Sequence, residues 1–243
     1  MNLILLEPGE VDGAGDVTLC DARAVHLLNV LKVSAGQTVR IGLLDGPFGS
    51  AVVTSLGLAH VSMRCTFDSS SPARPCVDLL LALPRPKVLR RLWAQLAALG
   101  VGRIILTNAE RVERNYFDTH VLAPECYRPL LIEGLQQARD TWVPAVSIHR
   151  QFRVLVEDHL DALSGDGIRL VADPRATTTV RDIVRQHQAQ RVLIAVGPEG
   201  GWNEFELRML EQHRFQLVGM GARTLRVDTA CVALLGIVRD ALS

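Results

Sequence analysis

The carboxylate of Glu199 lies inside a glycine-rich turn, V-G-P-E-G-G (196–201), which follows an apolar run and precedes a helical pattern. Free backbone N–H groups at a strand-to-helix turn favour an anion. This turn has neither the dinucleotide pattern G-x-G-x-x-G nor the phosphate-loop pattern G-x-x-x-x-G-K-[ST], and Glu199 would repel a phosphate. The turn therefore predicts a cationic or neutral ligand, with a tight turn carrying a solvated acid as the alternative.

The neighbours of Glu199 suit close approach by a ligand. Pro198 removes one N–H donor and fixes φ, whereas Gly200 and Gly201 permit a close contact or a positive φ. Asn203, followed three residues later by Glu206, predicts a capping box at the start of the next helix.

Two further loops have a similar placement. G-M-G-A-R-T-L-R-V-D-T-A (219–230) follows one apolar run and leads into the last helical pattern, and A-D-P-R (172–175) ends another. Parallel sheets bind ligands beyond the carboxyl ends of their strands, so we expect these loops to converge on one pocket.

The elements that must position these loops follow an α/β pattern. Short apolar runs alternate with segments whose apolar residues recur at spacings of three and four, which predicts crossover units around a mainly parallel sheet. The predicted strands are 77–83, 103–107, 145–148, 168–172, 192–196 and 216–220, and the predicted helices are 85–99, 124–139, 179–188, 203–213 and 229–242.

The first part of the chain predicts a separate small β-rich domain. Serines and prolines at 68–75 indicate a linker. Before it, segments 37–44 and 51–54 alternate around D-G-P-F-G (45–49), which is typical of a hairpin, and 22–31 predicts one helix. We expect a small barrel at 1–70 and an α/β domain at 76–243.

Composition narrows the class of protein. Of 243 residues, 48% are hydrophobic and 21% are charged, which excludes a disordered or fibrous chain, and no apolar run is long enough to cross a bilayer. The first residues lack the basic region of a signal peptide, and the five cysteines form no C-x-x-C pair, so we expect a cytoplasmic protein with reduced thiols. The seven histidines show no paired ligand spacing, which argues against metal-dependent hydrolysis and predicts no metal site.

Charge is balanced overall but uneven along the chain. Residues 1–72 carry four basic and seven acidic side chains, whereas residues 73–151 carry eleven basic and seven acidic ones. If the protein holds a nucleic acid, the middle of the chain is expected to neutralise most of the phosphates.

Together, A-D-P-R, I-A-V-G-P-E-G-G and G-M-G-A-R-T-L-R-V-D-T-A resemble the motifs of the SPOUT methyltransferases, and more closely those of the RsmE family, which methylates N3 of a uridine in 16S ribosomal RNA of the small subunit. The resemblance covers nearly the whole chain, including H-L-L-N-V-L-K (26–32). It implies a PUA-like β-barrel that binds RNA, followed by an α/β-knot domain with a trefoil knot. Periodicity alone cannot reveal such a knot.

The resemblance also implies S-adenosylmethionine as the cofactor, ribosomal RNA or the small subunit as the partner, a homodimer, and neither a membrane nor a metal. The cofactor carries a sulfonium and an ammonium but no phosphate, so Glu199 would attract it. Helix 229–242 is a candidate dimer interface, and a buried core helix explains it equally well. The implied cofactor-binding residues are Ala172, Pro174, Gly197, Pro198, Glu199, Gly200, Gly201, Val218, Met220, Gly221, Thr224, Leu225, Arg226, Thr229 and Ala230.

Methylation of uracil N3 requires that its proton leaves and that the resulting anion is stabilised. Arg226 is the first candidate for orienting the base and stabilising this charge, and Asp228 or Glu199 could accept the proton. The alternative for Arg226 is a salt bridge to Asp228 or a helix cap. The uridine must be single-stranded or flipped out. Candidate RNA contacts, each alone also typical of a solvated surface, are Arg85, Arg90, Arg91, Arg111, Arg114 and Arg139.

The chain departs from the family pattern in three places. A-L-G-V (98–101) replaces E-L-G-V, Leu135 replaces the glutamate of E-Q-x-x-R, and L-R-V-D-T-A (225–230) replaces L-R-x-E-T-A. These changes bear on the target nucleotide rather than on methyl transfer. Two alternatives stay open: a methyltransferase of the same fold that acts on another RNA, and a noncatalytic RNA-binding or ribosome-assembly factor. The second is disfavoured by the retained Gly197, Glu199, Gly200, Gly201, Arg226 and Thr229.

Overall fold

The computed structural model describes residues 3–221 and 223–243; Met1, Asn2 and Ala222, the last of them within the 219–230 motif, lie outside the described residues. The chain divides into two compact units. One unit contains the residues up to Arg74 together with Ile132–Val143, and the other contains Pro75–Leu131 and Pro144–Ser243. The sequence does not predict that 132–143 groups with the first unit.

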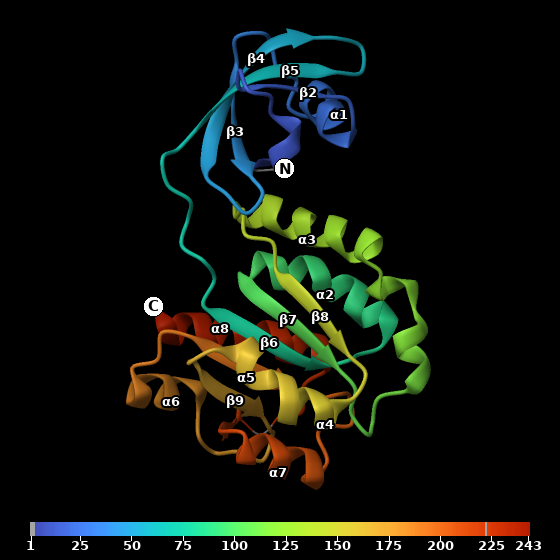
Figure 1. Ribbon diagram of the computed structural model, residues 1–243, viewed down its shortest axis with the longest axis vertical. Coiled ribbons are helices and arrows are strands. Elements are labelled where there is room, and N and C mark those ends of the chain that lie inside the picture. Colours follow the sequence, from blue (N-terminus) through green and yellow to red (C-terminus); the bar gives the residue numbers. More distant parts are fainter. Residues whose placement is uncertain (1–2, 222) are drawn as a thin grey trace. The chain divides into compact units, whose positions relative to one another are not determined.

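The first unit is built on a five-stranded mixed sheet that curls into a half-barrel (Figure 1). The strand order is β1-β3-β4-β5-β2, with β1 parallel to β3 and the other pairs antiparallel. The predicted hairpin around 45–49 joins β3 to β4. Alternate side chains of β2 and β5, such as Leu19 and Met63, are buried in the core of this unit. The elements are β1 (Ile4–Leu6), β2 (Asp16–Leu19), α1 (Ala22–Asn29), β3 (Thr38–Leu43), β4 (Phe48–Leu56) and β5 (Val61–Phe67).

Hydrogen bonds explain why 132–143 belongs to the first unit. The buried hydroxyl of Thr141 donates to the carbonyl of Gly46 at 2.7 Å. The indole N–H of Trp142 donates to the carbonyl of Pro72 at 2.9 Å, and the guanidinium of Arg74 lies 4.4 Å from the centre of the Trp142 ring. This segment is therefore fixed by contacts between residues that are far apart in sequence.

The second unit contains a six-stranded parallel sheet with the order β11-β9-β10-β6-β7-β8. All residues of the central strands β6 and β10 are buried. Such continuous apolar runs are typical of parallel strands that helices cover on both faces. The strands are β6 (Val77–Ala82), β7 (Val101–Thr107), β8 (Ala145–His149), β9 (Ile168–Ala172), β10 (Val192–Val196) and β11 (Phe215–Val218).

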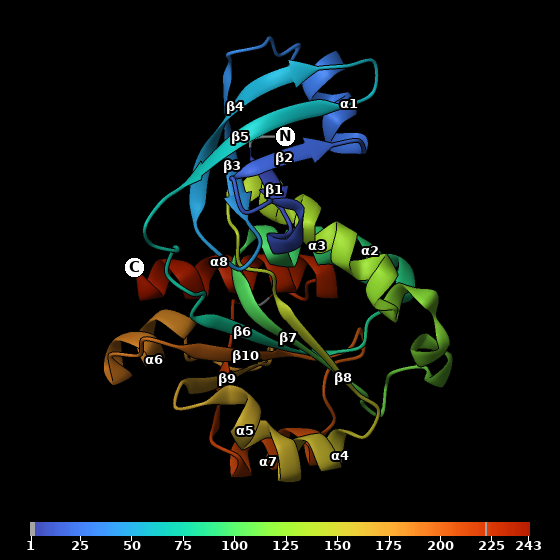
Figure 2. The same cartoon turned by 45° about the horizontal axis from the view of Figure 1, so that its top comes forward.

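Helices cover this sheet on both sides. Helix α8 packs on β6 and β10 and against α2 and α6, whereas α4, α5 and α7 gather on the side of the sheet away from α2 and α8 (Figure 2). A π-helical turn at Leu155–His159 joins α4 to α5. The helices of this unit are α2 (Pro86–Ala98), α4 (Phe152–Val154), α5 (Leu160–Ser164), α6 (Val180–His187), α7 (Glu204–Gln212) and α8 (Val227–Leu242), whereas α3 (Pro124–Ala138) begins in this unit and ends in the first.

The expected fold class is confirmed: a small curled β unit and an α/β unit with a parallel sheet. The predicted strand at 216–220 ends two residues early, because the backbone leaves the sheet at Gly219. The helical segment that begins at Phe152 was missed, although its apolar residues at 152, 155, 156 and 160 have helical spacing. Among the described residues, no helix is long and apolar enough to span a membrane.

Candidate functional site

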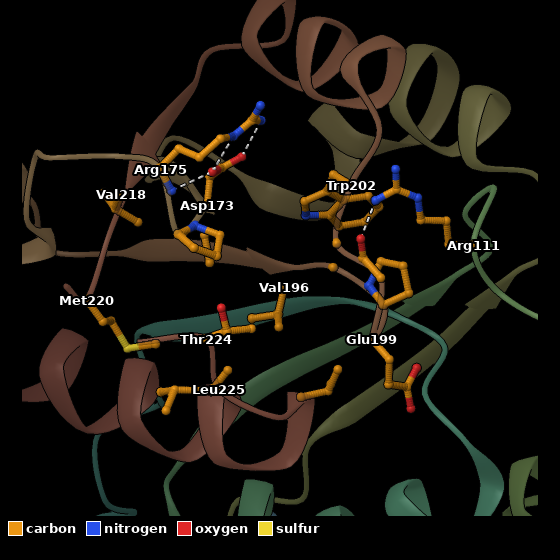
Figure 3. Close-up of a pocket in the computed structure, with 18 of the residues that line it drawn as sticks. Arg111, Asp173, Arg175, Val196, Glu199, Trp202, Val218, Met220, Thr224 and Leu225 are labelled. Atoms are coloured by element: carbon orange, nitrogen blue, oxygen red, sulfur yellow. Dashed lines mark hydrogen bonds and ion pairs between the residues drawn. The ribbon is translucent and has the colours of Figure 1, made fainter. Parts of the chain in front are cut away.

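The three motif loops meet beyond the carboxyl end of the parallel sheet, around a cavity of about 440 Å³ (Figure 3). They follow the adjacent strands β9, β10 and β11, so the expected convergence on one pocket is confirmed. The implied cofactor-binding residues that line the cavity are Ala172, Pro174, Gly197, Pro198, Glu199, Gly200, Gly201, Val218, Met220, Gly221, Thr224, Leu225 and Ala230.

The residues that line the cavity differ in part from those that the sequence led us to expect there. Arg226 and Thr229 are not among the described residues that line the cavity. Asp173 and Arg175 lie within the A-D-P-R motif, so the motif itself held the signal for them. Arg111 comes from the loop after β7, and the sequence named it as a candidate RNA contact rather than as a residue of this cavity. The lining residues that the sequence did not assign to the cofactor site are Arg111, Asp173, Arg175, Val196, Trp202, Asn203, Glu204, Arg223 and Val227.

Glycines shape the turn after β10. Gly201 has a φ of +72°, and its N–H donates to the carbonyl of Pro198 at 2.8 Å. The α-carbon of Gly197 faces Trp202, and an added Cβ would lie 3.1 Å from the indole Nε1. At Gly200 an added Cβ would lie 2.7 Å from Cδ of Arg111, whose guanidinium donates to the Gly200 carbonyl. Side chains at Gly197 and Gly200 would therefore displace Trp202 and Arg111, which line the cavity.

The predicted capping box forms at the start of α7. The side chain of Asn203 accepts the N–H of Glu206 at 2.8 Å, and the Glu206 carboxylate accepts the N–H of Asn203 at 2.8 Å. The second oxygen of Glu206, which is buried, accepts the N–H of Glu110 at 2.7 Å. This one carboxylate thus ties the loop after β10 to the loop after β7.

Glu199 has a protein partner as well as a place in the cavity wall. Its carboxylate accepts the backbone N–H of Arg85 at 3.4 Å, and the Nε of Arg85 lies 3.9 Å away. In Figure 3 the carboxylate points away from Asp173 and Arg175. The Glu199 side chain stays 37% exposed, so it can meet a ligand while it braces the turn.

The walls of the cavity carry charges of both signs. Three acidic residues line it, Asp173, Glu199 and Glu204, and so do three basic ones, Arg111, Arg175 and Arg223. Hydrogen bonds from the Arg175 guanidinium and backbone N–H hold the pKa of the buried Asp173 carboxyl below its usual value. Arg111 donates to a carbonyl and Arg175 is paired with Asp173, and the charges of the cavity wall balance. The wall as a whole therefore does not exclude a phosphate, and the argument against a phosphate depends on the position of Glu199.

Arg226 and Asp228 lie at the start of α8. Arg226 is the N-cap residue, its side chain is 74% exposed, and its Nε lies 3.7 Å from an oxygen of Asp228. The other oxygen of Asp228 accepts a hydrogen bond from Arg91 at 2.9 Å. The salt bridge and the cap position considered from sequence are therefore both present, and most of the Arg226 guanidinium stays accessible.

The six candidate RNA-binding arginines have different surroundings. Arg85 and Arg91 contact Glu199 and Asp228, respectively. Arg111 lines the cavity described above, and Arg114 lines a neighbouring one. Arg90 is exposed on α2, and Arg139 belongs to the first unit.

Helix α8 has a buried face. The residues Val227, Cys231, Leu234, Leu235 and Val238 of α8 are buried within the chain, which fits the core-helix alternative. Among the described residues, no group of three or more histidines, cysteines, aspartates or glutamates is arranged to hold a metal ion.

Known proteins are similar to this chain in sequence and in fold. Residues 71–239 match the family described as RNA methyltransferase domain. Ribosomal RNA small subunit methyltransferase E of Treponema pallidum is 34% identical over 245 residues, which cover 98% of this chain and 90% of the relative.

Two solved structures have the same fold. Ribosomal RNA small subunit methyltransferase E of Neisseria gonorrhoeae, bound to S-adenosyl methionine, gives a TM-score of 0.78 at 22% identity and covers 99% of this chain and 97% of its own. A methyltransferase of Legionella pneumophila in complex with bound SAM gives 0.74 at 20% identity, with coverage of 99% and 97%. By its sequence and its fold, the chain belongs to the RNA methyltransferase family, with the ribosomal RNA small subunit methyltransferase E proteins.

Proposed function

We propose that this protein transfers a methyl group from S-adenosylmethionine to N3 of a uridine in 16S ribosomal RNA of the small subunit. The observation that carries the proposal is the convergence of three motif loops on one cavity in a chain of this family. The relative from Treponema pallidum is named as a methyltransferase of the same subunit. We also propose that the protein acts in the cytoplasm and that it forms a homodimer.

The residues around the cavity fit this cofactor. Its apolar walls, including Val196, Met220 and Leu225, suit an adenine ring, and the glycine turn exposes backbone groups to a ligand at close range. The volume of about 440 Å³ lies within the range usual for small-molecule sites. Glu199 places a carboxylate in the wall, where a sulfonium or ammonium is attracted and a phosphate is repelled.

The cofactor supplies an activated methyl group, and the protein supplies position and charge. Arg226, largely exposed beside the cavity loops, orients the uracil and stabilises the negative charge that spreads over O2, N3 and O4 as the N3 proton leaves. Asp228 or Glu199 accepts that proton.

The division of labour between the two parts of the chain is also proposed. Residues 1–70 form the RNA-binding PUA-like part and 76–243 the methyltransferase part, from which 132–143 is set apart by its packing with the first unit. The arginines of the middle segment neutralise phosphates, because eleven of its side chains are basic and seven acidic. Action on another RNA, or a noncatalytic role in ribosome assembly, are the competing functions.

A methylation assay separates these functions. The protein is incubated with methyl-labelled S-adenosylmethionine and, in parallel, with free ribosomal RNA, small subunits and transfer RNA, and the product nucleoside is identified by mass spectrometry. We expect 3-methyluridine in the small-subunit RNA. Label in transfer RNA alone would establish the same chemistry on another substrate, and cofactor binding without any labelled RNA would favour the assembly factor.

A further inference from the structure

A second cavity, of about 470 Å³, lies beside the cofactor cavity in the same unit. It is lined by residues of the loop after β7, the start of α4 after β8, and the start of α7 after β10. These segments also follow carboxyl ends of parallel strands, the edge at which such sheets bind ligands. The two cavities thus occupy neighbouring positions along one edge of the sheet.

The two cavities share one wall. Asn203 lines both of them. Trp202, which lines the cofactor cavity, packs on Phe152, which lines the second cavity, with 5.4 Å between the ring centres. Trp202 and Phe152 are both buried. The packed rings of Trp202 and Phe152 therefore form part of the wall between the two cavities.

Three groups in the second cavity are available to a ligand, because their polar atoms or apolar surface are not used in contacts within the described protein. The Oδ1 of Asn108 is buried and has no hydrogen-bond partner among the described residues. The ring of Phe205 is 55% exposed although it is large and apolar. Arg114 is exposed and lacks an ion-pair partner in the part of the chain that the structure describes. The unpaired Oδ1 is the strongest of these signals, because burying a polar atom without a partner is unfavourable.

Two other charged side chains of this cavity, Glu206 and Arg153, already have partners within the protein. Both oxygens of Glu206 accept backbone N–H groups, from Asn203 and Glu110. Arg153 is paired with Glu157 at 2.9 Å. What is left for a ligand is therefore the carboxamide of Asn108, the ring face of Phe205, the guanidinium of Arg114 and the exposed carboxylate of Glu110.

We propose that this cavity holds an unpaired base of the substrate RNA, from a nucleotide next to the methylated one. The inference rests on the proposed function. Single-stranded RNA is recognised by stacking of splayed bases on aromatic rings and by hydrogen bonds to base edges. The carboxamide of Asn108 offers an acceptor and donors to a base edge, Phe205 offers a face for stacking, and Arg114 offers charge to the adjoining phosphate.

The test measures RNA binding separately from cofactor binding and from turnover. Fluorescence anisotropy with a labelled single-stranded oligonucleotide that spans the methylated site gives the Kd for RNA, and calorimetry gives the Kd for S-adenosylmethionine. Phe205→Ala is expected to raise the Kd for RNA at least about fivefold, the loss typical of one base–aromatic stack. Asn108→Ala is expected to raise it and to reduce the preference for the natural base at the neighbouring position.

Matched variants guard against an indirect effect. Phe205→Tyr keeps the ring and should bind RNA like the wild type. Val154→Ala removes an exposed apolar side chain of α4 that does not line either cavity in the described structure, and it should change neither Kd. All variants should bind the cofactor as the wild type does.

Two outcomes overturn the inference while leaving the proposed function in place: a Kd for RNA within twofold of wild type in both Phe205→Ala and Asn108→Ala, or an equal loss in Val154→Ala. Failure of the wild-type protein to bind the cofactor or to methylate any RNA would instead count against the proposed function. Normal methylation by the wild type therefore tells the two failures apart.

Discussion

Glu199, in the glycine turn after β10, accepts the backbone N–H of Arg85 at 3.4 Å, and the two residues are 114 positions apart. Arg85 is the residue before α2, so this contact ties the turn to the start of that helix. The Glu199 side chain also lines the cavity proposed to hold the cofactor. The Glu199 carboxylate therefore contacts the start of α2 and also borders the proposed site of a positively charged ligand.

Replacement of Glu199 tests this charge. Glu199→Gln keeps the shape of the side chain and removes its charge, so we expect weaker binding of S-adenosylmethionine by roughly fivefold, the equivalent of about 1 kcal/mol at a partly exposed site. S-adenosylhomocysteine lacks the sulfonium, and its affinity should fall less. Calorimetry with both ligands is the measurement; equal affinities of wild type and variant for S-adenosylmethionine would refute the role of the charge.

Replacement of Arg226 by alanine tests its proposed role in catalysis. Since its side chain is 74% exposed, Arg226→Ala should fold and bind the cofactor normally, while kcat for RNA methylation falls by roughly 100-fold or more, as when one group that stabilises developing charge is removed. Arg185→Ala, an exposed arginine of α6, is the matched control and should keep full activity. Unchanged turnover in Arg226→Ala would remove Arg226 from the mechanism.

Two glycines with opposite surroundings predict opposite changes in stability. A Cβ on Gly219 would lie 2.1 Å from the carbonyl oxygen of Ala176, whereas a Cβ on Gly236 of α8 would meet nothing within 4 Å. Gly219→Ala should lower the free energy of unfolding by about 2 kcal/mol, and Gly236→Ala should raise it by roughly 0.5–1 kcal/mol. Urea titrations measure both; a Gly219→Ala protein as stable as wild type would contradict the packing beside β11.

The ion pair of Asp173 and Arg175 predicts a dependence on pH. The pKa of Asp173 is lower in the folded than in the unfolded chain, so its ionised form stabilises the fold above roughly pH 4, the ordinary aspartate pKa. This stabilisation disappears as the pH falls through the folded pKa. Asp173→Asn should therefore be less stable than wild type at pH 5–8, and the difference should shrink below pH 4. A difference that stays constant into the acid range would exclude this linkage.

Local signals predicted much of the site. The buried strand β10, the turn that follows it and the capping box of Asn203 and Glu206 depend on neighbours within a few residues, and the structure contains all three. The loops after β9 and β11 were also expected beside this turn, because adjacent parallel strands end at one edge of the sheet.

Contacts between distant residues could not be predicted in this way. Arg111 meets Gly200 across 89 positions, and Thr141 meets Gly46 across 95. Neither contact leaves a periodic trace in the sequence, because each depends on how the strands are ordered. The same limit applies to Glu199, whose residue type indicated a ligand but whose protein partner, Arg85, became visible only in the fold.

Calorimetric titration of the wild-type protein with S-adenosylmethionine tests the central claim most directly. We expect saturable binding of one cofactor per chain, and no comparable heat with ATP, whose phosphates Glu199 would repel. Absence of saturable binding of S-adenosylmethionine, or tighter binding of ATP to the same cavity, would contradict the account.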